Sequence, residues 1–346
     1  MTRLRIAHVG PVATAIPPPK SGSVETMTSL LTEGLVARGH DVTLFATANS
    51  RTTAKLHASY PHGYRDDETM WPWELYEMIN LAAALERSRD FDIVHYQAQY
   101  YPMSLAFTRL TPIPIVQTLH HAPSEAEVRL WSRYPEAPFV AISNEQARRM
   151  HGLNVAGVVL HGIATERFTL SERPDDYLLF LGRFTEGKGV LQAIDAARRV
   201  GLPLVLVGAE NQYYRDHIAR HVDGAAVRYH GEADFDEKLT LYGGARALLY
   251  PVQESEPFGL VLAEAMACGT PVAALDRGAV REVVDEGVTG FAFETLDDLV
   301  AGLPRVFALD RRAVHERAVA KFSVERMVLG YEAVYHRLVE AHRAIA

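Results

Sequence analysis

The sequence predicts an α/β protein with two Rossmann-like doubly wound domains facing a cleft. The chain has 346 residues, which leaves room for two domains of about 150 residues each. Its first half opens with an apolar strand, a glycine-bearing loop, a helix and a second strand, the usual start of a parallel sheet. The same order begins again at Tyr177, after a polar, charged stretch over residues 164–176.

The elements of the first half follow from apolar runs and their flanking turn residues. We expect strands over residues 4–9, 41–46, 92–95, 113–119, 139–142 and 155–160. We expect helices over residues 24–37 and 73–87, and a short helix that ends near residue 150. Residues 47–90 are otherwise irregular and rich in aromatic side chains.

The second half gives strands over residues 177–181, 204–207, 227–230, 247–250 and 272–274. Its helices are expected over residues 190–200, 260–267, 278–285, 297–307, 312–321 and 324–345. We therefore predict a first domain over residues 1–165, a second over 166–323, and a last helix over 324–346.

Bulk composition narrows the class of protein. A formal net charge of -8 gives no electrostatic basis for binding nucleic acid. Cys268 is the single cysteine, which excludes a disulfide framework and a multi-cysteine metal site, and no HExxH spacing points to zinc. No run of 18 apolar residues occurs, and the N-terminal segment has no apolar core of signal-peptide length. We expect a cytoplasmic protein with no membrane span and no metal.

Residues 251–272 form the most informative stretch of the sequence. A strand precedes it, and it consists of an acidic loop followed by a helix that ends at a glycine. Glu256 and Glu264 are eight residues apart, about 12 Å on a continuous helix, so they do not make a close glycosidase-like carboxylate pair. We expect Pro257 in the first helical turn. Glu256 precedes the helix and can turn toward a ligand, whereas Glu264 lies within it.

Two strand-to-helix junctions offer unpaired backbone N–H groups to an anion, because ligands bind beyond the carboxyl ends of parallel strands. One is Gly22-Ser23 in the first half, and the other is Phe258-Gly259-Leu260 in the second. Neither is a GxGxxG or P-loop motif, so simple tight turns are the alternative.

Charged and titratable residues follow two other strands. Arg183 and Lys188 bracket Gly187, where two cations would neutralise a diphosphate leaving group, and a solvated surface pair is the alternative. His120 closes the strand over residues 113–119. Its position fits either a structural role or a role in a site.

Taken together, these segments resemble the retaining glycosyltransferases of family four, which have the GT-B architecture. The run ESEPFGLVLAEAMACGTPV resembles the family signature with its Glu-x7-Glu spacing, and Gly22 to Glu25 resembles the Gly-Gly-x-Glu loop with Ser23 replacing the second glycine. Further matches are His120, the segment 161–163, and the pairs Gly182-Arg183 and Lys188-Gly189. Two departures are Val252, where the family usually has serine, and Ala164, where it usually has an acid.

The resemblance implies a nucleotide-sugar donor held by the second domain, with a UDP-sugar as the first choice. Arg183 and Lys188 would bind its diphosphate with the N–H groups at Phe258, Gly259 and Leu260. Glu264 would bind the ribose and Glu256 the donor sugar. From the first domain, His120 would contact the donor sugar, and Gly22 would let its loop approach the phosphates. The catalytic set implied is Glu256, His120, Arg183 and Lys188.

The family transfers hexoses with retention and without a metal, by attack on the face that the diphosphate leaves. The first helix, ETMTSLLTEGLVA, lacks the basic stripe typical of relatives acting on membrane lipids, so we expect a small soluble acceptor. Trp71, Trp73, Tyr100 and Tyr101 form either a stacking wall for a sugar or ordinary packing. The alternatives are a nucleotide-sugar hydrolase or epimerase, and a non-catalytic nucleotide-sugar-binding protein.

Overall fold

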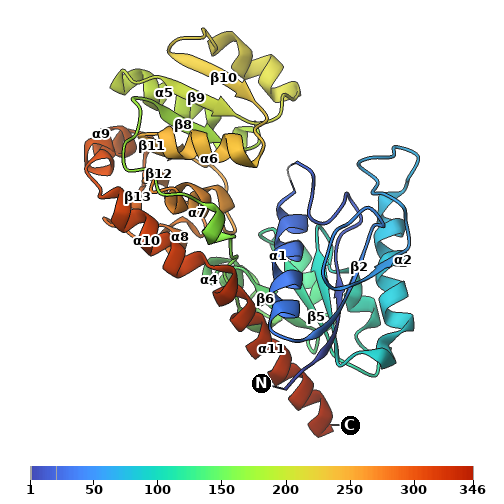
Figure 1. Ribbon diagram of the computed structural model, residues 1–346. Coiled ribbons are helices and arrows are strands. Elements are labelled where there is room, and N and C mark those ends of the chain that lie inside the picture. The colour runs from blue at the N-terminus through green and yellow to red at the C-terminus, as the bar shows by residue number, and fades with distance from the viewer. Residues whose placement is uncertain (1, 21, 346) are drawn as a thin grey trace. The chain divides into compact units, whose positions relative to one another are not determined.

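A computed structural model describes residues 2–20 and 22–345 and divides the chain into two compact units (Figure 1). Unit 1 holds Met1–Gly162 together with Val324–Ala346, and unit 2 holds Ile163–Ser323. The first division thus falls three residues before the predicted position. Each unit is a parallel α/β sheet, so the predicted fold class is confirmed.

Unit 1 contains a parallel sheet in the order β3-β2-β1-β4-β5-β6-β7. Its strands are β1 (Arg5–Val9), β2 (Asp41–Ala46), β3 (Lys55–Ala58), β4 (Ile93–Ala98), β5 (Ile115–Leu119), β6 (Pro138–Ala141) and β7 (Asn154–Val158). Its helices are α1 (Ser23–Ala37), α2 (Trp73–Glu86), α3 (Glu125–Trp131), α4 (Asn144–Arg149) and α11 (Val324–Ile345). The order reverses between β1 and β4, where ligands of such sheets bind.

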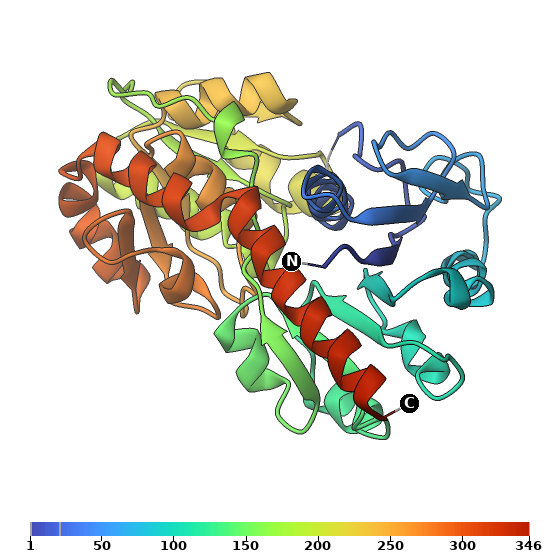
Figure 2. The same cartoon turned by 60° about the horizontal axis from the view of Figure 1, so that its bottom comes forward.

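The two faces of the unit 1 sheet differ in chemistry, because successive side chains of a strand point to opposite faces. One face is apolar and packs on α2 and α3, with Val94 and Tyr96 of β4 in its core. The other face carries the buried His95 and Gln97 of the same strand. Helix α11 packs against α1 and β7 within unit 1 (Figures 1 and 2).

Unit 2 contains a six-stranded parallel sheet in the order β10-β9-β8-β11-β12-β13. Its strands are β8 (Leu178–Leu181), β9 (Leu204–Val207), β10 (Val227–Gly231), β11 (Ala247–Tyr250), β12 (Val272–Leu275) and β13 (Gly290–Phe293). Its helices are α5 (Val190–Val200), α6 (Phe235–Gly244), α7 (Leu260–Ala267), α8 (Val280–Val283), α9 (Leu296–Phe307) and α10 (Arg311–Phe322). The order reverses between β8 and β11.

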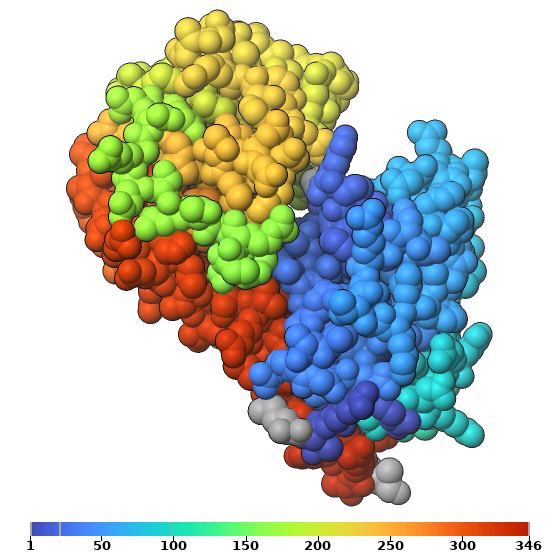
Figure 3. Space-filling view, viewed as in Figure 1, coloured from blue at the N-terminus to red at the C-terminus, as the bar shows by residue number. Residues whose placement is uncertain are grey.

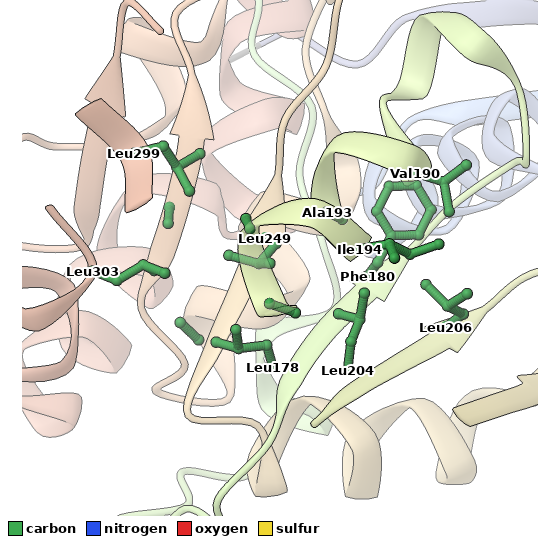
Figure 4. Packing of buried hydrophobic residues seen from close by; sticks show 14 of the residues in the cluster. Leu178, Phe180, Val190, Ala193, Ile194, Leu204, Leu206, Leu249, Leu299 and Leu303 are labelled. Carbon is green, nitrogen blue, oxygen red and sulfur yellow. The ribbon is translucent and has the colours of Figure 1, made fainter. Parts of the chain in front are cut away.

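The core of unit 2 lies between the sheet and the pair α5 and α9 (Figure 4). Leu178 and Phe180 of β8 and Ile194 of α5 meet there, all fully or almost fully buried. Helices α6 and α10 pack against α7, which in turn packs on β11 and β12. Strands β8 and β11 pair directly, so their ends lie side by side.

Several elements differ from the sequence prediction. The edge strands β3 and β13, each paired with a single neighbour, were not predicted. Helices α3 and α6 were also missed. The helix expected over residues 278–285 shortens to Val280–Val283. Helix α7 begins at Leu260 after Gly259 with a left-handed φ of 87°, so the placement of Pro257 in its first turn was wrong.

Candidate active site

The loops after β8 and β11 meet at the point where the strand order of unit 2 reverses. The Gln253 N–H donates to the Gly187 carbonyl across 2.8 Å. Gly189 has a φ of 74°, and a Cβ atom there would overlap the carbonyl oxygen of Pro251. A side chain is excluded at Gly189 for both reasons. The contact brings the basic loop and the acidic loop of the sequence prediction together.

Lys188 and Glu256 form the centre of this site. The Lys188 Nζ lies 2.7 Å from Glu256 Oε2, and the two side chains are 15% and 8% exposed. The Tyr250 hydroxyl donates to the same carboxylate oxygen, and the Phe258 N–H lies 3.4 Å from Glu256 Oε1. Burial first, and then the neighbouring Glu256, raise the pKa of Tyr250 well above its usual range, so it stays a hydroxyl donor. Glu256 is thus held by an ammonium and a hydroxyl.

Arg183 and Glu254 lie at the rim of the same site. Arg183 is exposed, and its charge opposes part of the rise in the pKa of Tyr250, which places it near that ring. No hydrogen bond or ion pair to Arg183 is found among the described residues. Glu254 Oε1 lies 3.6 Å from Lys188 Nζ, with its side chain 56% exposed. Of the two predicted cations, Lys188 is therefore paired, and Arg183 faces solvent.

Helix α7 offers backbone groups rather than side chains at its start. Its N-cap residue Gly259 provides no side-chain cap, so the first-turn N–H groups have no partner from a capping side chain. The Phe258 ring is buried and packs edge-on against Phe322, at 5.9 Å between centroids. The predicted contribution of Phe258, Gly259 and Leu260 to anion binding thus rests on their N–H groups, of which that of Phe258 already donates to Glu256 Oε1.

Glu264 lies farther along α7 and is partly exposed. Its Oε2 accepts a hydrogen bond from the Tyr242 hydroxyl at 2.8 Å. Tyr242 is fully buried, and burial followed by the charge of Glu264 raises its pKa well above the usual range. The Tyr242 hydroxyl therefore orients the Glu264 carboxylate by a hydrogen bond, in the same way that the Tyr250 hydroxyl orients Glu256.

The two tyrosines are the functional residues that sequence reasoning missed. Tyr250 ends a buried strand directly before the acidic loop, a position that marks it as a candidate. Tyr242 lies in α6, and the capping box formed by Asp234 and Glu237 is the sequence signal that marks the start of this helix.

Gly22 and His120 belong to unit 1. Gly22 precedes α1 with an extended φ of 171°, and a Cβ atom there would lie 2.8 Å from Glu25 Oε2 and 2.9 Å from the Pro18 Cβ. Crowding, rather than backbone conformation, therefore requires glycine. His120 follows β5, with its Nε2 2.8 Å from Gln97 Oε1 and its ring stacked on His161 at 5.2 Å. Burial, and then His161, hold the pKa of His120 well below its usual range.

An aromatic cluster stands at the carboxyl ends of the unit 1 strands. The Trp73 ring contacts Tyr64, Tyr100 and Tyr101, with centroid distances of 5.7, 5.4 and 6.2 Å. Tyr100 and Tyr101 are about half exposed, at 48% and 51%. Three of the four predicted aromatic residues thus meet, whereas Trp71 is 72% exposed and makes no ring contact with the described residues.

The described residues contain no helix long and apolar enough to cross a membrane. Within the same described part of the chain, no group of three histidine, cysteine or acidic side chains is arranged to hold a metal ion.

Comparison with known proteins assigns the family. Residues 163–318 match the model of glycosyl transferases group 1, and residues 24–167 match that of glycosyltransferase family 4. Glycogen synthase of Mycobacterium tuberculosis is 26% identical, with 92% of each chain covered. A phosphatidyl-myo-inositol mannosyltransferase of Propionibacterium freudenreichii is 33% identical over 59% of this chain and 58% of its own.

A solved structure shows the same fold over the chain. The Anabaena protein HepE, in complex with UDP and glucose, is 16% identical and has a TM-score of 0.74, with 97% of this chain and all of that chain covered. The two matching family models run end to end across both units, and the site at the strand reversal of unit 2 lies inside the first of them. The chain is a glycosyltransferase with the GT-B fold and belongs to family four.

Proposed function

We propose that the protein transfers a hexose from a nucleotide-diphosphate sugar to a hydroxyl acceptor, with retention of the anomeric configuration and without a metal. Among the possible donors, a UDP-sugar is our first choice. The observation that carries the proposal is the largely buried Lys188–Glu256–Tyr250 cluster, with Lys188 at its edge, at the strand reversal of unit 2. It sits beside Arg183 and the uncapped start of α7, a combination suited to a diphosphate next to a sugar. The solved relative with bound UDP and glucose supports the choice of donor.

In this proposal the residues of unit 2 have separate roles. Arg183, Lys188 and the N–H groups of residues 258–260 hold the diphosphate. Glu264, oriented by Tyr242, accepts hydrogen bonds from the ribose hydroxyls. Glu256 faces the donor sugar, where its carboxylate stabilises the positive charge that develops at the anomeric carbon.

The proposed reaction replaces one bond to the anomeric carbon by another on the same face. The bond from that carbon to the diphosphate oxygen breaks, and the acceptor oxygen forms the new bond. The acceptor proton passes to the departing diphosphate oxygen, which leaves as the protonated nucleoside diphosphate. This reaction path requires no covalent intermediate between the sugar and Glu256.

A thermal-shift panel of UDP-, GDP-, ADP- and dTDP-sugars tests the donor. A ligand at a hundred times its Kd stabilises the native state by about 2.7 kcal/mol, which raises Tm by several degrees. A positive donor is then incubated with candidate acceptors, and the anomeric configuration of the product is read by NMR. An inverted product contradicts the retaining mechanism, and no Tm shift with any donor contradicts the donor site.

Two other functions give different outcomes in the same assays. Release of free nucleotide without acceptor, at the rate seen with acceptor, indicates a hydrolase. Conversion of one nucleotide-sugar into its epimer indicates an epimerase. Binding without turnover indicates a non-catalytic protein, which the paired Lys188 and Glu256 disfavour.

For the acceptor we propose a small soluble molecule with a ring that stacks on the aromatic cluster. Tyr100 and Tyr101 leave about half of their surface open around Trp73, and Tyr64 donates to Gln99 Oε1 at 2.9 Å on the same edge. Half-exposed rings beside polar groups suit an amphipathic ring such as a sugar. Tyr100→Ala should raise the acceptor KM and leave the donor KM unchanged.

A lipid-linked acceptor is the second candidate, because α2 turns apolar side chains outward. Leu75, Met78 and Ile79 are 52%, 40% and 55% exposed, and the α2 surface lies uncovered in the space-filling view (Figure 3). Some relatives are phosphatidyl-myo-inositol mannosyltransferases. However, α2 carries only acidic charges, unlike helices that bind anionic membranes. If the protein floats together with phosphatidylcholine vesicles, the lipid-linked acceptor is favoured. If it does not, the soluble acceptor is favoured.

A further inference from the structure

The buried polar face of the unit 1 sheet contains a chain of hydrogen bonds that ends at His120. It starts on α1, passes through β1 and the end of β4, and reaches the residue after β5. Its members are Thr28, Thr32, His8, Gln97 and His120, and the first four are buried. The direction of each hydrogen bond can be derived in turn.

The first link fixes the Thr32 hydroxyl proton. Thr32 Oγ1 lies 2.7 Å from the Thr28 carbonyl oxygen, one turn earlier on α1. The carbonyl can only accept, so the hydroxyl donates to it. Thr32 Oγ1 also lies 2.7 Å from His8 Nδ1, and its single proton is already used. His8 Nδ1 therefore carries a proton and donates to Thr32.

The next links follow from neutral imidazole rings. Burial lowers the pKa of His8 to about 3, so with a proton on Nδ1 its Nε2 is bare. That nitrogen lies 2.8 Å from Gln97 Nε2, which donates to it. The amide oxygen of Gln97 then faces His120 Nε2, also at 2.8 Å. An amide oxygen only accepts, so His120 Nε2 carries the proton.

Reversing the chain would require turning every member. Gln97 would flip, and His120 would carry its proton on Nδ1. The Thr32 hydroxyl would turn to His8, which would leave two oxygen acceptors, of Thr32 and Thr28, 2.7 Å apart with no proton between them. A short contact between two acceptors is unfavourable.

We propose that this chain fixes His120 in the Nε2–H tautomer and presents its bare Nδ1 as a hydrogen-bond acceptor. His120 is partly exposed, and no partner for its Nδ1 is found among the described residues. The substrate group that meets His120 Nδ1 is therefore a hydrogen-bond donor, such as a sugar hydroxyl, and not an ionised phosphate or carboxylate oxygen. Gln97, His8 and Thr32 act as positioning residues, because they set the proton position on His120 without touching substrate themselves.

The role in catalysis rests on the proposed function, but the tautomer does not. A long-range 1H–15N correlation spectrum of the protein labelled at its histidines distinguishes bare from protonated ring nitrogens without any substrate. His120 is assigned from the signals that disappear in His120→Asn. The expected result is a bare Nδ1 and a protonated Nε2. A protonated Nδ1 overturns the proposal outright.

Two variants test the chain itself. Gln97→Leu removes the acceptor of the His120 proton, and Thr32→Val removes the anchor, three links from His120. Both should shift the His120 nitrogens toward an average of two tautomers. Gln117→Leu is the matched control, since Gln117 is a buried strand glutamine that bonds Ser104 rather than a histidine. Unchanged His120 signals in both test variants overturn the proposal.

Activity separates the tautomer from the proposed function. With the donor selected by the thermal-shift panel, Gln97→Leu should lower kcat/KM about tenfold, the usual effect of one lost hydrogen bond. Gln117→Leu should stay near wild type at equal Tm. If no donor binds, the proposed function fails while the tautomer assignment stands. If the tautomer is as expected and Gln97→Leu keeps full activity, the positioning role is wrong.

Discussion

Replacing Lys188 by alanine tests the centre of the unit 2 site. At 2.7 Å, the gross attraction between Lys188 and Glu256 is about 6 kcal/mol at an effective dielectric constant of about 20. Desolvation offsets much of it, and breaking such a buried pair typically costs about 3–5 kcal/mol. We expect the lower end of that range, because Tyr250 still donates to Glu256. Loss of one pre-placed charge should lower kcat/KM by about 10²–10³.

The double variant Lys188→Ala/Glu256→Gln separates stability from function. Glutamine leaves no unpaired buried carboxylate, so the free energy of unfolding should recover most of the loss while activity stays low. Arg199→Ala is the control, since Arg199 lies in the last turn of α5 and pairs with Asp297 at 2.8 Å, away from Lys188 and Glu256 in the contact network. Denaturant unfolding and donor turnover are measured on each. Near-wild-type turnover of Lys188→Ala would refute its assigned role.

Three further predictions concern buried groups. Burial raises the pKa of Glu77 to about 8, above its unfolded value of 4.5. Its stabilising contribution is therefore complete below pH 4.5 and lost as pH rises through 8, so the free energy of unfolding should fall by a few kcal/mol over that window, and much less in Glu77→Gln. Gly189→Ala should lower stability by more than about 2 kcal/mol in denaturant unfolding, from its left-handed φ and the clash with Pro251. Burial raises the pKa of the Cys268 thiol to about 12, so a thiol reagent at neutral pH should label it only after unfolding.

The grouping of the unit 2 site residues could be predicted from the sequence for a physical reason. Lys188, Glu256 and the start of α7 lie at ends of strands that are themselves strong apolar runs, so the topology alone brings them to one edge. What the sequence could not show is which side chain pairs with which. The hydrogen bond from Tyr250 to Glu256 depends on loop conformation, and Tyr242 reaches Glu264 from a different helix.

In unit 1 the same limit applies more strongly. His120 was readable as a residue at a strand end, but its proton position depends on partners drawn from separate parts of the chain. His8 and Gln97 are 89 residues apart in sequence. Alternation along β4 indicates that His95 and Gln97 share a face, yet polar residues on a buried face contradict the simple expectation of an apolar core. That contradiction is itself the signal, because buried polar side chains require partners.

The charge balance at the strand reversal of unit 2 bears on how the departing diphosphate would act. The cations Lys188 and Arg183 are offset by Glu254 and Glu256, and the start of α7 adds roughly half a positive charge. A bound diphosphate would therefore keep much of its own negative charge, and its oxygen would stay basic enough to take the acceptor proton. A site with surplus cations would hold the product more tightly and lower that basicity. In the proposed reaction, the pairing of Lys188 with Glu256 would thus favour both proton transfer on the departing face and release of the nucleotide.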